Sequence, residues 1–245
     1  MHVAQRFLPC LLAIGAATSP AFTQSGEQLE APRWCEYAKH YLSRHNGMEF
    51  DCRASKIRCI KMNNYGCSQN HGTVPYPGQL RTRAGQPVTD GQRHALYEHP
   101  KWSVHKTIAT LLRYYSRGKK TPLAIAETYA PWCDTRGSRQ LNGGWGRTCS
   151  DGLPSVPTSF TGPRCARPSG SPTRAQCEHC NCPSAIAEFY IRGTGGRITD
   201  PVQLFDENGK PSAPMRRFLK QIITLETGYV PSEGLVTEAI ESFGP

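Results

Sequence analysis

The sequence contains no apolar run long enough to cross a membrane. Its longest apolar stretch, residues 7–17, is well short of the roughly 20 residues that a membrane-spanning helix needs. No later segment approaches that length. We therefore expect a chain without an integral membrane span.

Familiar catalytic and nucleotide-binding motifs are missing as well. There is no H-E-x-x-H pair of zinc ligands, no G-x-S-x-G elbow, no P-loop and no dinucleotide fingerprint. The eight histidines are scattered, and His105 is interpreted as a surface residue on a predicted helix. The sequence thus gives no support for serine or cysteine nucleophiles, and it predicts no bound metal or cofactor.

Acidic residues are scarce relative to basic ones. The 245 residues include 29 Lys and Arg against 19 Asp and Glu, a formal net charge of +10. Such a surface favours polyanions, which include nucleic acid, anionic lipid and the acidic polymers of a cell wall. The charge is spread, and only residues 113–120 are dense enough to form a patch, which is either a solvated face or a binding site.

The first 21 residues have the features of an export signal. His2 and Arg6 form a weakly basic start, and the apolar run follows. Residues 19–21 (Ser-Pro-Ala) offer small side chains for signal peptidase, with a cut after Thr23 as the alternative. We expect residues 1–21 to be removed and residues 22–245 to form a single disulfide-rich helical domain, periplasmic or secreted.

The number of cysteines agrees with export. Of the eleven cysteines, Cys10 lies in the export signal, which leaves an even ten in the mature chain. An even count in an oxidising compartment predicts five disulfides. Because short loops close most easily, we expect pairing mostly within two groups, while the connectivity stays open. The groups are Cys35, Cys52, Cys59 and Cys67, and then Cys133, Cys149, Cys165, Cys177, Cys180 and Cys182.

Residues 177–182 (CEHCNC) have the spacing of a local metal or redox site. A C-x-x-C pair beside a histidine can bind zinc or act as a redox pair. A redox pair is expected before a helix in a βαβ unit, and zinc would need a second pair of ligands. Neither context is visible, so structural disulfides are the preferred interpretation, with zinc and redox chemistry as alternatives.

Apolar periodicity predicts a mainly α-helical fold with little β-structure. The clearest helices span residues 103–117 and 121–130, with Ser103 and Thr121 as N-caps and Gly118 as the left-handed residue between them. The link between these helices is so short that they should pack on each other as a hairpin.

The rest of the chain completes this prediction of five to six helices around one core. Helical periodicity also marks residues 33–44, a segment that starts at 181 or 184 and ends at 193, and two segments that start at Ser212 and Ser232. Three stretches are not predicted to be helical. Residues 56–62 alternate like a strand, and residues 72–92 form a loop that can hold a small hairpin. Residues 131–183 form a long irregular insertion that the disulfides of its cysteines hold together.

Carboxylate chemistry is the one enzymatic mechanism that the sequence leaves open. Acid-assisted glycoside cleavage needs a glutamic acid that an apolar pocket keeps protonated. Glu98 is near Tyr97 and Trp102, and Glu49 lies between Met48 and Phe50, so these two are the candidate acids. The simpler interpretation of each is a solvated or ion-paired surface glutamate.

The order of motifs in residues 62–131 is distinctive. Residues 63–66 (NNYG) are followed by a glycine-rich gap, then by residues 97–100 (YEHP), then by the two helices, the second ending in residues 129–131 (YAP). This order resembles the lysozyme-like or transglycosylase-like helical domain of bacteriophage virion proteins, which runs from an N-N-P-G-N-I segment to a T-I-x-x-I-I-x-x-Y-A-P helix. Tyr65 stands where that family has proline. The resemblance implies a helical module acting on peptidoglycan glycan strands, without assigning a catalytic glutamate here.

These features, and a resemblance of the whole chain to exported proteins of Gram-negative bacteria, predict a disulfide-stabilised protein acting at the cell envelope. One hypothesis is a peptidoglycan glycan-strand hydrolase or lytic transglycosylase with Glu98 or Glu49 as the acid. The alternative is a non-enzymatic periplasmic scaffold that binds cell wall or another envelope component. A secreted effector is the third. We expect peptidoglycan or another anionic envelope polymer as the partner rather than nucleic acid, and the oligomeric state stays open.

Overall fold

A computed structural model describes residues 29–44, 47–55, 57–90, 93–129, 183–192 and 196–244. Within these ranges it contains seven helices and one two-stranded sheet, which confirms a mainly α-helical protein with little β-structure. None of the helices described here is long and apolar enough to cross a membrane. The elements are α1 (Trp34–Tyr41), β1 (Leu42–Ser43), α2 (Arg58–Lys61), α3 (Pro100–Ser116), α4 (Pro122–Tyr129), α7 (Pro183–Tyr190), α8 (Ala213–Thr227), β2 (Val230–Pro231) and α9 (Glu233–Glu241).

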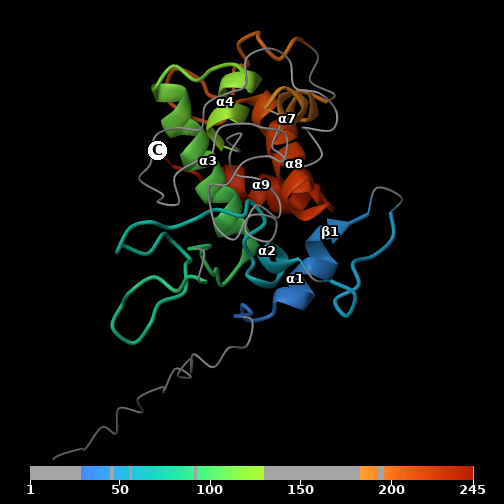
Figure 1. Cartoon of the computed structure of the whole chain (residues 1–245), viewed down its shortest axis with the longest axis vertical. Coiled ribbons are helices and arrows are strands. Elements are labelled where there is room, and N and C mark those ends of the chain that lie inside the picture. The colour runs from blue at the N-terminus through green and yellow to red at the C-terminus, as the bar shows by residue number, and fades with distance from the viewer. Residues whose placement is uncertain are drawn as a thin grey trace, which may run out of the picture.

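The helices pack around one main apolar core. In Figure 1, α1 and α2 lie at one end of the long axis, α4 and α7 lie at the other, and α3, α8 and α9 lie between them. The stripe predicted for α8 is fully buried, as its spacing requires. The fully or almost fully buried side chains of this core include Ile60, Tyr65, Val104, Ile108, Leu111, Ile125, Met215, Phe218, Leu219, Ile222, Ile223 and Leu235.

The longest helix in the described part of the chain, α3, begins three residues earlier than predicted. His99 is its N-cap, since its side chain accepts a hydrogen bond from the Lys101 amide, and Pro100 occupies the first turn. Ser103 is therefore not the cap. It lies inside the helix, fully buried, where its hydroxyl accepts from the Tyr65 amide at 2.9 Å and donates to the Pro100 carbonyl at 2.8 Å.

The short link between α3 and α4 has the predicted caps but not the predicted packing. Gly118 has a φ of +78°, and the Thr121 hydroxyl accepts from the Ala124 amide at 3.1 Å. The two helices touch near the link, but α3 packs chiefly on α9, and α4 packs chiefly on α7. The hairpin was an incomplete expectation, because partners distant in sequence cover most of both apolar faces.

Two predictions in the N-terminal part were wrong. The first helix ends at Tyr41 rather than Arg44, because Leu42 and Ser43 pair antiparallel with β2. Residues 58–61 form a single helical turn instead of a strand. Cys59 and Ile60 are adjacent and both buried, which a helical turn permits and a strand with one face toward solvent does not.

Residues 69–97 form a set of isolated antiparallel bridges rather than a sheet. Arg81 pairs with Pro87, which confirms a small hairpin in this loop, and Gln79 pairs with Tyr97. A small second core of Met62, Val88 and Leu96 lies beneath these bridges. The loops of this segment contact α3, since Tyr76 lies against His105 and Gly78 lies against Trp102.

The C-terminal helices match their predicted starts and ends closely. Gly228 ends α8 in the left-handed conformation, and the Ser232 hydroxyl caps α9 by accepting from the Leu235 amide at 3.3 Å. Ser212 precedes α8 as predicted, although its hydroxyl donates to the Gln203 carbonyl instead of capping. Residues 1–21, the insertion between 131 and 182, and the expected helix end at Gly193 lie outside the described residues.

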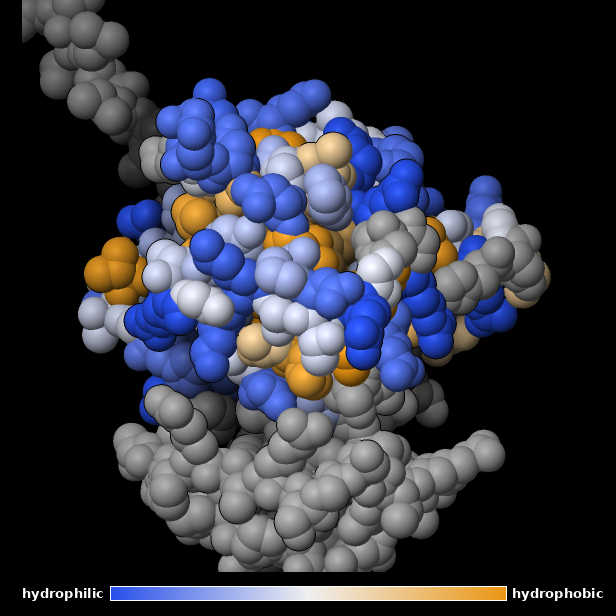
Figure 2. Space-filling model, turned by 90° about the horizontal axis from the view of Figure 1, so that it is seen from above, coloured by the Kyte–Doolittle hydropathy of each residue, from blue (hydrophilic) through white to orange (hydrophobic). Residues whose placement is uncertain are grey.

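Figure 2 shows a mainly hydrophilic face on which apolar residues are scattered among charged ones. The exposed large apolar residues in the described part are Met48, Val74 and Leu225, which come from three different segments. Scattered apolar residues of this kind are normal on a protein surface.

The basic residues of the patch at residues 113–120, which are Arg113, Arg117, Lys119 and Lys120, are all exposed.

Candidate functional site

Glu98 lies on the surface immediately before α3. Its side chain is exposed, and its Oε1 accepts a hydrogen bond from Trp102 Nε1 at 3.1 Å. The predicted aromatic neighbour is therefore present, but the described residues form no apolar pocket around this side chain of the kind that keeps a carboxyl protonated. Tyr97, the other aromatic neighbour in sequence, is fully buried beneath the site.

Trp102 is held in place by backbone and cation contacts. Gly78 has a φ of +66°, and a Cβ added there would come within 1.9 Å of the indole ring. The position therefore requires glycine both for its backbone conformation and for the close approach of the ring. Lys101 Nζ lies 5.1 Å from the centre of the ring, within the range of a cation–π interaction.

Trp102 belongs to a row of aromatic and imidazole rings along the outer side of α3. We call Tyr37, His99, Trp102, His105 and Tyr76 the aromatic row. The ring centres of Tyr37 and His99 are 4.5 Å apart, those of Trp102 and His105 are 5.7 Å apart, and those of His105 and Tyr76 are 5.8 Å apart. His99 and Trp102 are joined through the first turn of α3, where the Trp102 amide donates to the His99 carbonyl. All five side chains are partly exposed.

His99 is the polar centre of one end of this row. Because its Nδ1 accepts from the Lys101 amide at 3.1 Å, the neutral ring carries its proton on Nε2, which faces the Tyr41 hydroxyl at 3.3 Å. Glu238 of α9 lies beside this pair and forms an ion pair with Lys101 at 2.9 Å. Burial lowers the pKa of His99, and the Glu238 carboxylate opposes that effect. Burial and Glu238 both raise the pKa of Tyr41.

His105 is the polar centre of the other end. It is half-buried instead of being a plain surface residue, with its Nδ1 2.7 Å from the Tyr76 hydroxyl and its ring 4.8 Å from that of Phe243. Burial lowers the pKa of His105 and raises that of Tyr76 to about 12. Both groups are therefore neutral near pH 7 and can exchange hydrogen bonds with a polar ligand.

Three large rings of the row lie outside the apolar clusters of the described part, and each has a cation over its face. Arg33 lies 5.1 Å from the centre of Tyr37, Lys101 lies 5.1 Å from Trp102, and Lys106 lies 4.5 Å from Tyr76. Arg33 and Lys101 also pair with carboxylates. Lys106 differs, because within the described part of the chain no carboxylate pairs with it, and burial and the nearby charge of Arg113 lower its pKa.

Asn63 connects the two segments that carry the row. It is fully buried, and its Nδ2 lies 3.2 Å from the Pro32 carbonyl and 3.1 Å from the Tyr97 carbonyl. It thereby joins the start of α1 to the residues just before α3. This is the first asparagine of the motif in residues 63–66, and its observed role is to position the chain.

Glu49, the second candidate acid, lies on another part of the surface. It follows β1, bridges to Ser43 through the backbone, and is exposed. Its neighbour Phe50 is buried against Trp34 and Tyr229. No described contact connects Glu49 with Glu98, so the structure does not bring the two candidate acids together as a pair.

The first group of four cysteines pairs within itself, as expected. The disulfides are Cys35–Cys52 and Cys59–Cys67. The second group, from Cys133 to Cys182, lies outside the described residues, together with the zinc and redox alternatives for residues 177–182. The two observed bonds support a disulfide-stabilised protein.

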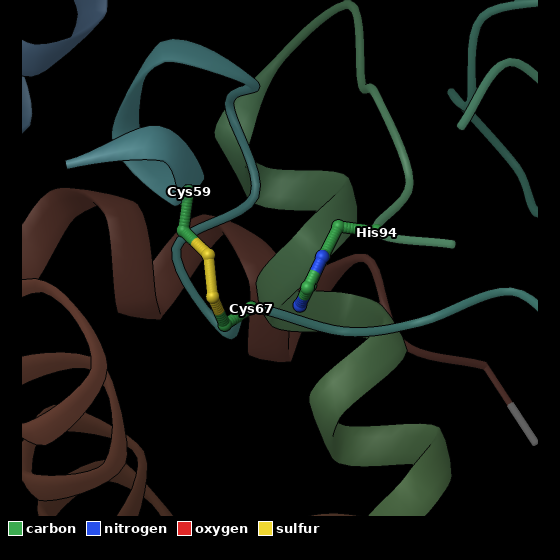
Figure 3. A group of neighbouring side chains, drawn as sticks. All are labelled: Cys59, Cys67 and His94. Atoms are coloured by element: carbon green, nitrogen blue, oxygen red, sulfur yellow. A yellow bond between two sulfur atoms is a disulfide. The ribbon is translucent and has the colours of Figure 1, made fainter. Parts of the chain in front are cut away.

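Sequence reasoning missed a second cluster, beside the Cys59–Cys67 bond. Figure 3 shows His94, from the segment before α3, next to the two sulfur atoms. His94 Nδ1 is 3.2 Å from Asp90 Oδ2, and Arg58 Nε is 3.0 Å from the same oxygen. The only local signal was the spacing of Asp90 and His94 in residues 90–94 (DGQRH), because the cysteines are brought in by the fold.

The aromatic row was also missed as a unit. Trp102 and His105 are three residues apart on one helix and so share a face, as helical periodicity implies. Tyr37 and Tyr76 come from distant segments and could not be added from spacing. Comparison with models of known protein families and with curated proteins finds no match to this chain.

Proposed function

We propose that this protein is exported to the cell envelope and binds the glycan strands of peptidoglycan along the aromatic row. The observation that carries the proposal is the set of three rings outside the apolar core, each with a cation over its face. Aromatic rings stack against the C–H faces of sugar rings. Lysines attract the carboxylates that peptidoglycan carries on its peptide stems. A row of rings suits a linear chain of sugars.

Lys106 is the residue best placed to bind a ligand carboxylate. It is half-buried beside Tyr76 and pairs with no carboxylate in the described part. Its positive charge is therefore partly desolvated without a described counter-ion. An anion bound there would stabilise that charge. The Tyr76 hydroxyl and the His105 ring next to it supply neutral hydrogen-bonding groups for sugar hydroxyls.

Sedimentation of the mature protein with purified peptidoglycan tests this proposal. Trp102→Ala removes the central ring and should weaken binding at least tenfold, which corresponds to about 1.4 kcal/mol. Lys106→Ala should weaken binding severalfold at low salt and less at high salt, because added ions screen the charge. Lys119→Ala is the matched control, since it removes an exposed lysine from the basic patch of residues 113–120.

The control also separates two interpretations of the surface. If Lys119→Ala weakens binding as much as Lys106→Ala does, the protein binds through general positive charge and the aromatic row is not the site. Periplasmic fractionation of cells that express the full chain tests export independently.

Glycan cleavage is the second candidate function. It is favoured by the position of Glu98 at the middle of the row, hydrogen-bonded to the same tryptophan. Analysis of soluble muropeptides in the sedimentation experiment detects it, because only cleavage releases fragments. Release of fragments by the wild type and not by Glu98→Gln would establish the enzyme, whereas binding without release leaves the binding protein.

A further inference from the structure

The Cys59–Cys67 disulfide lies in a site that has the composition of a metal centre. Cys59 Sγ, Cys67 Sγ and a ring nitrogen of His94 all lie within 4.8 Å of one another. Cys59 and His94 are buried, and Cys67 is partly exposed, so of the three residues it is Cys67 that solvent reaches most. Two thiolates and an imidazole are a ligand set that zinc prefers, with a fourth position left for water.

These three residues are held together by more than the sulfur–sulfur bond. Asn64 is fully buried, its amide donates to the Cys59 carbonyl at 2.8 Å, and its carbonyl accepts from the Cys67 amide at 2.8 Å. Its Nδ2 also donates to the Ala95 carbonyl at 2.9 Å, next to His94. None of these three hydrogen bonds involves a sulfur atom, so opening the disulfide does not itself break them.

His94 is also oriented as a metal ligand would be. Its Nδ1 lies 3.2 Å from Asp90 Oδ2 and 3.1 Å from Arg58 Nη2. In the tautomer that carries its proton on Nδ1, the ring donates to Asp90, and Nε2 is the nitrogen with a lone pair for a metal. Histidines that bind metals through one nitrogen almost always give the other N–H to a carboxylate or carbonyl. Asp90 is in that position, and its own place is fixed by the His94 amide, which donates to Oδ1 at 2.8 Å.

We propose that reduction of the Cys59–Cys67 disulfide opens a binding site for a thiophilic divalent cation such as Zn²⁺, with Cys59, Cys67 and His94 as ligands and Asp90 orienting His94. A dithiol donor supplies two electrons and two protons, so the S–S bond breaks, two thiols form, and the donor becomes a disulfide. Binding of the cation then displaces the two thiol protons. Two thiolates balance the charge of Zn²⁺, as a buried site requires. With Zn–S bonds of about 2.3 Å in a tetrahedral site, the sulfur atoms separate to about 3.8 Å.

Cobalt binding to the full mature chain tests the proposal, because thiolate-bound Co²⁺ absorbs light in a characteristic charge-transfer band. The oxidised protein and protein reduced with a phosphine, which does not compete for the metal, are titrated with Co²⁺. We expect reduction to create the band. His94→Gln should remove one bound ion per chain or weaken its affinity at least tenfold, and Asp90→Asn should weaken it by about 10- to 100-fold.

All these variants keep every cysteine, so metal bound elsewhere in the chain contributes equally to each and cancels in the comparison. His40→Gln, which changes an exposed histidine, is the matched control and should bind as the wild type does. Asn64→Asp should weaken binding, because it removes the donor to Ala95 while keeping the size of the side chain.

Four results would overturn the proposal. The first is equal cobalt binding by reduced wild type and reduced His94→Gln. The second is equal binding before and after reduction. The third is loss of the helical circular dichroism spectrum on reduction, and the fourth is a Cys59–Cys67 bond that stays closed in excess reductant, since the site must open within a folded chain.

Discussion

The indole of Trp102 donates a hydrogen bond to the carboxylate of Glu98, four residues earlier, at 3.1 Å. The bond fixes the ring at the middle of the aromatic row and places one negative charge beside it. If the surface only binds glycan, the Glu98 carboxylate serves to orient the tryptophan, whereas in an enzyme the carboxyl group would act on the substrate. The two roles can be separated by a change that keeps the hydrogen bond.

Glu98→Gln is that change. The glutamine oxygen still accepts from Trp102, so we expect unchanged melting temperature and binding to peptidoglycan that is equal to or slightly stronger than that of the wild type, since one negative charge is gone. Sedimentation and thermal unfolding measure both quantities. A large loss of binding would show that the carboxylate itself contacts the ligand.

Gly78→Ala should weaken binding without contact between the new methyl group and the ligand. The added Cβ collides with the indole and must displace it, and alanine is also strained at a φ of +66°. Gly85→Ala is the control, because Gly85 has a φ of +76° but no neighbour within 4 Å. Both variants should lose stability from backbone strain, Gly78→Ala the more because the indole must also move, and only Gly78→Ala should lose affinity. Equal affinities for the two variants would show that the position of Trp102 is unimportant.

Protonation of His99 should destabilise the fold in mild acid. Burial holds the pKa of His99 below its ordinary value of 6.5, so the unfolded chain takes up this proton first as the pH falls. The stability is therefore complete above about pH 6.5 and decreases as the pH falls below that value. His99→Asn keeps a side chain that can cap α3 but does not titrate.

The measurement is the melting temperature at pH 7.5 and at pH 5.5. The wild type should lose more stability between these values than His99→Asn does. His105 also has a lowered pKa, so part of the loss should remain in the variant. If both proteins lose the same amount, His99 is not responsible.

The core of α3 should tolerate less change than its ends. Leu111 is fully buried, and Leu111→Ala should lower the free energy of unfolding by about 2–5 kcal/mol. Leu112 is only partly buried, so Leu112→Ala should cost less, and Lys119→Ala in the exposed link should cost almost nothing. Denaturant unfolding gives the three values, and any other order would contradict the packing described for α3.

The sequence predicted those parts of the fold that depend on neighbours along the chain. The buried stripe of α8, the left-handed glycines 118 and 228, and the caps Thr121 and Ser232 all follow from local rules. Ser103 was misjudged as a cap because its hydroxyl bonds to Tyr65, which is 38 residues away. The strand predicted over residues 56–62 failed for a similar reason, because the buried contacts of Cys59 and Ile60 come from other segments.

The candidate site was less predictable, because it depends on distant segments. Glu98 and Trp102 could be paired by their spacing, and that pair is present. The cation over Tyr76 and the position of His94 beside a disulfide depend on how residues 57–97 fold against α3, which no spacing rule gives. Buried Asn63 and Asn64 help to fix this arrangement, because their side chains donate hydrogen bonds to the backbone carbonyls of Tyr97 and Ala95.

Trp34 provides an internal comparison for the central claim. It also donates its indole N–H to a glutamate four residues earlier, Glu30 at 2.8 Å, and it also has a lysine over its ring, Lys61 at 5.3 Å. Unlike Trp102, it packs against the apolar core and lies outside the aromatic row. The two tryptophans thus share their local chemistry and differ in whether they belong to the proposed site.

The most direct test is an NMR titration of the protein labelled with ¹⁵N in its tryptophan side chains. Each of the four tryptophans gives one indole signal, and the variants Trp102→Phe and Trp34→Phe assign two of them. Soluble peptidoglycan glycan fragments are then added. If the aromatic row binds glycan, the Trp102 signal shifts and saturates, while the Trp34 signal stays in place. A Trp102 signal that does not move, or equal shifts of both signals, would contradict the proposed function.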